Sequence, residues 1–186
     1  MRLSATSYFV DYVVYPAAVT SLTAAALYAT PLERWGIWAV SVAAGAATWT
    51  FAEYHLHRWV FHHVPYIKGM HLAHHDDQKA LIGTPSWISL ALIGVVVLLP
   101  AILLAGFAYG AGFTAGITLG YLVYIIVHHA VHHWRIRPGS YLYRLKHRHA
   151  LHHHYSDQGN YGVTTGFWDK VFGTDIKVGR EARQSR

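Results

Sequence analysis

Cysteine is absent from the 186 residues of this chain, and charged residues make up only 13% of it. Without cysteine there can be no disulfide, no iron–sulfur cluster and no thiolate metal site, so any metal ion must be held by histidine and carboxylate groups. Hydrophobic residues, in contrast, make up 53% of the chain. This combination is typical of membrane proteins.

No recognised nucleic-acid-binding motif accompanies the net charge of +6. The positive charge is concentrated in residues 135–186, which hold ten Lys and Arg against four Asp and Glu. In a membrane protein, a basic segment after the last apolar run more often marks the cytoplasmic face than a nucleic-acid site. We therefore expect no nucleic-acid partner.

Four apolar segments approach the ~20 residues that a helix needs to cross a bilayer. The second is expected to continue as a helix beyond Phe51 and to carry the first histidines out of the membrane. Pro100 is expected to bend the third, and the short connection to the fourth predicts a hairpin. In the fourth, Gly112, Gly116 and Gly120 recur at every fourth position, which favours close helix contact. The expected spans are residues 8–29, 35–51, 87–107 and 109–127.

Four spans would leave the N-terminus, residues 52–86 and the C-terminal region on one side of the membrane. All sixteen histidines would lie on that side, with Arg34 alone among the 15 Lys and Arg on the other. The positive-inside rule makes the histidine side cytoplasmic. Asp11, near the start of the first span, is expected to be a solvated or helix-N-terminal acid.

The predicted architecture is therefore all-α. It consists of a single multi-pass membrane-embedded domain over residues 1–186, with a cytoplasmic histidine-rich helical cap over residues 52–86 and 128–175.

The sixteen histidines include four spaced boxes, a pattern that packing alone does not explain. On a helix, residues three and four apart share a face, so each box can direct its imidazoles at one locus. A five-residue spacing places two side chains ~140° apart, so that pair can converge only at a helix end or distortion. The boxes are His57 and His62; His71, His74 and His75; His128, His132 and His133; and His149, His152 and His153.

These boxes predict metal binding, because neutral imidazole is the commonest protein ligand for iron, zinc and copper. Ten ligands exceed what one ion can use, whereas two ions with about five each would be natural. Imidazole ligands alone do not identify the metal, since affinity favours copper or zinc over ferrous iron. The remaining histidines outside the boxes are interpreted as amphipathic interface residues, namely His55, His63, His129, His147 and His154.

In order and spacing, these motifs resemble the fatty acid hydroxylase/sterol desaturase superfamily of histidine-box membrane di-iron oxygenases. The similarity covers residues ~50–175 in register and is closest to the fatty acid 2-hydroxylases, through the EY-x2-HR-x2-FH start and the GVT-x3-WD-x-VFGT end. The motifs that carry it are EYHLHRWVFHH, HLAHH, YLVYIIVHHAVHH, KHRHALHHHY and NYGVTTGFWDKVFGT.

By position, the resemblance implies ten metal ligands: His57, His62, His71, His74, His75, His128, His132, His149, His152 and His153. Further matched positions would support these ligands or the fold: Glu53, Tyr54, Arg58, Tyr124, Lys146, Tyr155, Trp168 and Asp169. Because a metal-bound histidine usually donates its other N–H to a carboxylate or carbonyl, Glu53 and Asp169 are the expected acceptors. Beyond the metal centre, no catalytic residue is predicted.

The resemblance also implies O2-dependent hydroxylation of a lipid acyl chain at two iron ions, which zinc could replace in a purified sample. No haem, flavin or nicotinamide motif is visible, so electrons are expected from a separate haem protein, or from a ferredoxin with its reductase. Two departures leave the substrate open. Ile125 follows Tyr124 where the hydroxylases often have an acid, and the segment between His75 and Trp87 is short.

Two alternatives remain at this stage. Within the superfamily, the substrate could be a sterol, a carotenoid or another lipid, and the reaction could be desaturation. Outside it, the chain could be a non-enzymatic metal transporter or sensor. Transport predicts ionisable ligands inside the spans, whereas the second to fourth expected spans contain no Asp, Glu, Lys or Arg. The enzyme is therefore the favoured interpretation.

Overall fold

The structure, a computed structural model, describes residues 2–177. These residues are helical, with no strand among them beyond a single bridge between Arg2 and Ile82, which confirms the predicted all-α class. The α-helices are α1 (Ala5–Phe9), α2 (Asp11–Tyr28), α3 (Trp35–His55), α4 (Pro65–Asp76), α5 (Ser86–Leu92), α6 (Leu99–His133), α7 (Tyr141–His154) and α8 (Phe167–Val171). The other helices are the 3-10 turn η1 (Leu32–Arg34) and the π-helices η2 (Leu56–Phe61) and η3 (Ile93–Leu98).

The long helices expose apolar side chains that no other described part of the chain covers. Val13 on α2, Val40 on α3 and Leu103 on α6 are 68%, 66% and 76% exposed. Large exposed apolar faces mark surfaces that another apolar phase covers. Two helical stretches, Ala5–Tyr28 and Ser86–His133, are long and apolar enough to cross a membrane. Helix α3 covers the expected second span but is not one of these two, so the count of four spans stays a prediction.

The stretch from α5 to α6 folds back on itself at Gly106, where a φ of +78° interrupts the helix. Beyond this point the chain returns so close to its first leg that a Cβ on Gly110 would lie 2.6 Å from Ile102 N. The reversal confirms the predicted hairpin. The π-helix η3 directly precedes the turn that contains Pro100. Helix distortion was expected at this proline.

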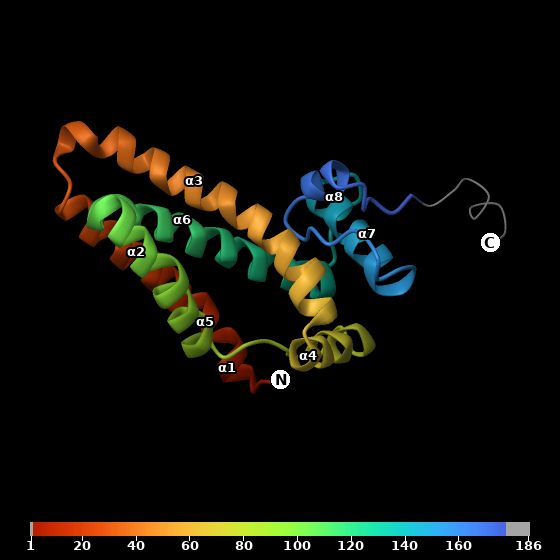
Figure 1. Cartoon of the computed structure of the whole chain (residues 1–186). Helices are drawn as coiled ribbons and strands as arrows, with labels where there is room; N and C mark the ends of the chain where they lie inside the picture. The colour runs from red at the N-terminus through yellow and green to blue at the C-terminus, as the bar shows by residue number, and fades with distance from the viewer. Residues whose placement is uncertain (1, 178–186) are drawn as a thin grey trace.

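Helices α3 and α6 run side by side (Figure 1) because glycines let their backbones approach closely. A Cβ on Gly116 would lie 2.0 Å from Val42 O, and one on Gly120 would lie 2.6 Å from Trp49 Cβ. No side chain fits in that space. The face formed by Gly112, Gly116 and Gly120 is therefore the close-contact surface that its spacing predicts.

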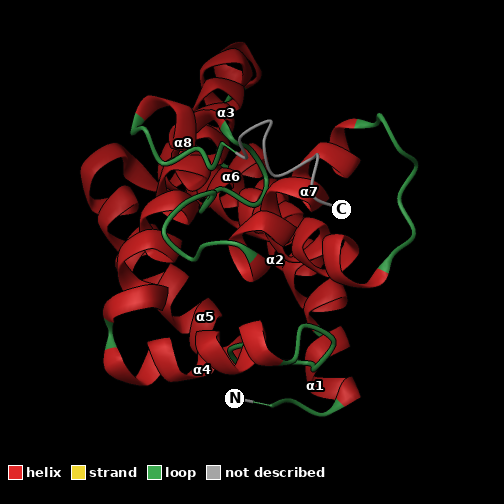
Figure 2. Ribbon diagram, turned by 90° about the vertical axis from the view of Figure 1, so that its right-hand side faces the viewer, coloured by secondary structure: helices red, strands yellow, loops and turns green. Residues whose placement is uncertain are grey.

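Helices α4, α7 and α8 gather at the end of the molecule where α3 and α6 finish (Figure 1). The N-terminal segment returns to the same end, with α1 near α4 in both views (Figures 1 and 2). There Leu3 N donates to Leu81 O at 2.8 Å. As predicted, α3 continues past Phe51 into this region. This end of the molecule holds the histidine boxes.

Candidate metal centre

The first histidine pair lies at a local change of helix type. At its end α3 becomes the π-helix η2, in which hydrogen bonds span five residues instead of four. As a result, the rings of His57 and His62 stack with their centroids 5.3 Å apart and their planes at 25°. This is a distortion of the kind that the five-residue spacing requires if the two imidazoles are to meet.

The structure brings the ten predicted histidines together in two groups. Within each group, one ligand-type nitrogen per residue lies within 4.8 Å of all the others. His133, the remaining box residue, lies outside both groups and stacks on His129, with ring centroids 4.3 Å apart. Group 1 is His57, His62, His71, His75 and His152, and group 2 is His74, His128, His132, His149 and His153.

The division between the groups follows helix geometry. On α4, His71 and His75 are four residues apart and share group 1, whereas His74 belongs to group 2. Because neighbouring residues on an α-helix point ~100° apart, an adjacent histidine pair serves both groups. The expectation that residues three apart share one locus is therefore wrong here. Helix α7 repeats the arrangement with His149 and His153 in group 2 and His152 in group 1.

In group 1 the facing nitrogens cannot all be satisfied by hydrogen bonds. His71 Nε2 lies 3.1 Å from His57 Nε2, 3.2 Å from His62 Nε2 and 3.0 Å from His75 Nε2. A neutral imidazole nitrogen is either one donor or one acceptor, so it cannot pair with three such neighbours. Adjacent ligands bound at ~2.1 Å to one ion lie roughly 3 Å apart. The donor set therefore fits a shared cation.

Group 2 shows the same chemistry. His132 Nε2 lies 3.1 Å from His74 Nε2, 3.3 Å from His128 Nε2 and 2.9 Å from His149 Nε2. Both ring nitrogens of His153 are buried and have no hydrogen-bond partner among the described residues. Buried polar atoms are nearly always satisfied, so an unpartnered imidazole in this position also fits an ion.

Burial keeps these imidazoles neutral. It lowers the pKa of His62 and His74 to about 4, because removal from water disfavours the charged ring and neighbouring imidazoles repel a second charge. Burial likewise lowers the pKa of His152 to about 3. Since a metal ion binds the neutral ring, both groups are able to bind metal at neutral pH.

Backbone carbonyls orient two of the group 1 rings. In the loop that follows α7 (residues 155–166), Tyr161 O lies 2.5 Å from His57 Nδ1 and Gly159 O lies 2.8 Å from His152 Nδ1. With the proton on Nδ1 donated to each carbonyl, the Nε2 lone pair of each ring is left for an ion. The sequence gives no sign of this role, because every residue carries a carbonyl.

Glu53 accepts no hydrogen bond from a histidine of either group among the described residues, so its predicted role as a direct acceptor is wrong. Its carboxylate, 3% exposed, accepts instead from Val163 N at 2.6 Å and from Thr164 N at 2.8 Å. The Thr164 hydroxyl donates a third hydrogen bond to it, at 2.5 Å. Glu53 therefore ties the end of α3 to the loop that follows α7.

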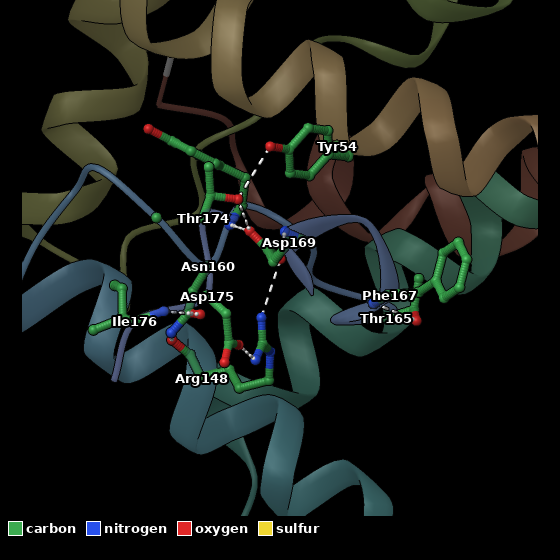
Figure 3. Close-up of polar contacts among 12 residues, drawn as sticks. Tyr54, Arg148, Asn160, Thr165, Phe167, Asp169, Thr174, Asp175 and Ile176 are labelled. Carbon is green, nitrogen blue, oxygen red and sulfur yellow. Dashed lines mark hydrogen bonds and ion pairs between the residues drawn. The ribbon is translucent and has the colours of Figure 1, made fainter. Parts of the chain in front are cut away.

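The prediction for Asp169 fails in the same way. The fully buried carboxylate of Asp169 accepts from Tyr161 N at 2.9 Å and from Gly162 N at 3.0 Å. It also accepts from Thr174 Oγ1 at 2.8 Å and pairs with Arg148 at 3.1 Å (Figure 3). Both predicted carboxylates thus bind backbone N–H groups of residues 161–164 instead of the histidines. They fix the loop whose carbonyls orient the rings.

Tyr54 and Tyr124, two of the residues expected to support the ligands or the fold, lie in different surroundings. The ring of Tyr124 stacks almost parallel on His128 of group 2, with centroids 5.6 Å apart and planes at 9°. The hydroxyl of Tyr54 lies 3.0 Å from Thr174 Oγ1 and accepts a hydrogen bond from Arg58 at 2.9 Å. Tyr124 therefore contacts a grouped histidine directly, whereas Tyr54 supports the segment after α8.

A cavity of about 160 Å³ adjoins both groups. His71 of group 1 lines it together with His74 and His128 of group 2. Much of the remaining wall is aliphatic or aromatic, including Met70 and Ile125. An apolar ligand in this cavity would therefore lie beside histidines of both groups.

Fold and site together define a helical protein with extensive apolar surface and a two-part histidine centre able to bind metal. The sequence profile described as "Fatty acid hydroxylase" matches residues 42–174, and this chain belongs to that family. The match confirms the predicted superfamily.

Characterised relatives are hydroxylases of fatty acyl chains. The chain is 34% identical over 147 residues to fatty acid 2-hydroxylase of Mus musculus, covering 71% of this chain and 38% of that protein. It is 34% identical over 166 residues to a dihydroceramide fatty acyl 2-hydroxylase of Arabidopsis thaliana, covering 77% and 64%. It thus spans less than two thirds of either relative.

Among solved structures, scs7p, in which only the hydroxylase domain is visible, matches with a TM-score of 0.79 and 26% identity. The match covers 92% of this chain and 67% of that one. The helical arrangement is therefore shared over nearly the whole chain.

Proposed function

We propose that this protein hydroxylates a lipid acyl chain with O2, using two iron ions held by group 1 and group 2. One observation carries the proposal: histidines from both groups line a single, largely apolar cavity. When bound, iron would supply the O2 chemistry that an unactivated C–H bond requires. The names of the relatives, which are fatty acyl 2-hydroxylases, favour a carbon close to the acyl carbonyl.

The chain's own residues would hold and position the reactants. Group 1 and group 2 would each supply five neutral imidazoles. In group 1, loop carbonyls orient the rings of His57 and His152. The cavity wall, including Met70, Tyr124 and Ile125, would exclude water and hold one methylene of the acyl chain against the centre.

Electrons would come from a separate protein, either a small haem protein or a ferredoxin with its reductase. This part of the proposal is supported by the sequence, which contains no cysteine for a cluster and shows no haem, flavin or nicotinamide motif. Activity of the purified protein should therefore depend on an added donor, and full O2-dependent turnover without one would contradict it.

We further propose four membrane spans within a single domain, with the histidine cap in the cytoplasm. The exposed apolar faces of α2, α3 and α6 support this topology, as does the gathering of α4, α7 and α8 at one end. Because the chain has no cysteine, Glu33→Cys and Lys170→Cys provide single labelling sites. A membrane-impermeant maleimide applied to intact cells should label the first and not the second, and the reverse pattern would invert the topology.

The function is tested by expressing the protein in a host that supplies fatty acids, acyl amides, sterols and carotenoids, followed by mass spectrometry of the lipids. We expect an acyl chain that gains one oxygen atom. His74→Ala and His152→Ala should abolish this product while the protein still inserts, whereas His147→Ala, at an exposed histidine outside both groups, should retain it.

Other products would indicate a different reaction or a different substrate. Loss of two hydrogens would indicate desaturation, and an oxidised sterol or carotenoid would change the substrate. Full turnover by both His74→Ala and His152→Ala would refute the site.

A further inference from the structure

The cavity beside group 1 and group 2 is lined by helix faces that differ in polarity. Helix α4 contributes His71 and His74, and α6 contributes Tyr124, Ile125 and His128. The third wall comes from α1 and the start of α2, where the lining residues carry polar groups. A ligand in the cavity would therefore meet imidazoles on two sides and a polar surface on the third.

That third wall contains a buried carboxylate. Asp11 is 9% exposed and lines the cavity together with Tyr8 and Tyr12, so it is not a solvated acid. The other expectation, an acid at a helix N-terminus, is confirmed because α2 begins at Asp11. The Ser86 hydroxyl donates a hydrogen bond to one of its oxygens, Oδ1. The other oxygen, Oδ2, receives no hydrogen bond from a described residue, and the protein does not fully enclose it. An unpaired carboxylate oxygen in an apolar cavity is costly unless a donor reaches it.

The packing of α1 and α2 against α6 sets the position of this carboxylate along α6. Tyr8 OH lies 3.2 Å from His129 Nδ1, and the Tyr15 ring meets the Tyr121 ring with centroids 4.8 Å apart, so the two segments are antiparallel here. Asp11 is three residues beyond Tyr8. At ~1.5 Å per residue it lies roughly 5 Å from the level of His129, or about one helical turn.

We infer that Asp11 is a positioning residue that accepts a hydrogen bond from an N–H or O–H group of the lipid, next to the reacting carbon. This inference rests on the proposed function. Asp11 lines the same cavity as His71, His74 and His128, so anchoring a donor there would bring carbons near the polar end of the acyl chain to the centre.

The same carboxylate sets the substrate class. An acyl amide, or another neutral lipid with a hydroxyl or amide donor, satisfies its free oxygen. The carboxylate of a free fatty acid offers no donor when ionised and is repelled by like charge in a poorly screened cavity. The site should therefore take acyl chains from neutral, donor-bearing lipids and discriminate against free fatty acids.

The test compares two lipids with the same chain, palmitoyl ethanolamide and palmitic acid. Their binding to the purified metal-loaded protein is measured in nanodiscs. The position of any hydroxyl group introduced is determined separately, after O2 and an electron-donor protein with its reductase are added. Asp11→Leu removes the acceptor, and Asp11→Asn keeps the shape without the charge. Glu33→Gln, at an exposed acid in η1, is the matched control and should behave as wild type.

Hydrogen bonds to charged groups contribute enough that Asp11→Leu should bind the amide lipid roughly ten- to a hundredfold more weakly than wild type. Asp11→Asn should narrow the preference for the amide over the acid, and the hydroxylation position should spread along the chain in both variants. Unchanged affinity, preference and position in Asp11→Asn would overturn the inference. Because binding is measured apart from turnover, the two ideas can fail separately. An Asp11-dependent preference without any oxidised product, in the presence of the added donor, would support the contact between Asp11 and the lipid and refute the hydroxylase function.

Discussion

Replacing Asp169 by Asn should loosen the loop after α7 while leaving the helices in place. The buried carboxylate accepts hydrogen bonds from Tyr161 N, Gly162 N and Thr174 Oγ1, and it pairs with Arg148. Asparagine has one acceptor oxygen in place of two, so its NH2 group would face at least one N–H donor. The variant therefore removes both a charge and a hydrogen bond from a site that water does not reach.

The magnitude follows from these contacts. Breaking a buried ion pair by removing one partner costs about 3–5 kcal/mol. Since Arg148 keeps a second partner in Asp175, we expect the lower end, about 3 kcal/mol of unfolding free energy. Displacing the Tyr161 carbonyl would also remove the partner of His57. Loss of such a partner typically weakens metal binding about 10- to 100-fold.

Two measurements check this prediction: thermal unfolding in detergent, and metal affinity by competition with a chelator. Asp175→Asn is the matched control, because Asp175 pairs with the same Arg148 but makes no hydrogen bond to the loop. The control should lose less than about 1 kcal/mol and keep its metal affinity. If Asp169→Asn melts with the wild type and holds metal as tightly, the loop does not orient the group 1 ligands.

Three further perturbations follow from the packing and the histidine groups. Gly116→Ala would place a Cβ 2.0 Å from a backbone oxygen of α3 and should lower the free energy of unfolding by about 1–3 kcal/mol. Gly36→Ala, whose Cβ meets nothing within 4 Å, should be neutral or stabilising. Equal melting temperatures of the two variants would contradict the close contact. In the metal-free protein, the pKa of His62 and His74 is about 4 against 6.5 for the free side chain, so the unfolded chain binds protons first as the pH falls. The unfolding free energy should be greatest above about pH 6.5 and decrease towards pH 4 by roughly 1 kcal/mol per pH unit for each such histidine. Melting temperatures measured as a function of pH check this. A melting temperature that does not change, or that rises as the pH falls, would refute the burial of these histidines as neutral rings. Chelation should lower the melting temperature, and added Fe²⁺ or Zn²⁺ should restore it; a melting temperature indifferent to metal would argue against binding in the folded state.

Helical spacing was sufficient to predict much of the site. The five-residue interval between His57 and His62 required a distortion, and the structure provides the π-helix η2 there. The recurring glycines predicted the contact between α3 and α6. Both patterns depend on neighbours along one helix, which a sequence displays directly.

The remainder depends on how distant segments meet, which spacing does not encode. Residues three apart on α4 fall into different groups, so the division depends on which histidines of other helices each of them meets. The partners of His57 and His152 are carbonyls, which no side-chain pattern reveals. Asp11 is near the start of an apolar run, where a solvated acid is common. Its burial depends on segments distant in the sequence, including Ser86 of α5, which donates to its carboxylate.

The central claim is that imidazoles from four separated boxes hold two metal ions. Anomalous X-ray scattering at the iron edge, from crystals of the iron-loaded protein, tests it most directly. We predict two peaks per chain, one within group 1 and one within group 2, each surrounded by the Nε2 atoms that lie about 3 Å apart in this structure. A single peak, or iron bound away from both groups, would contradict it.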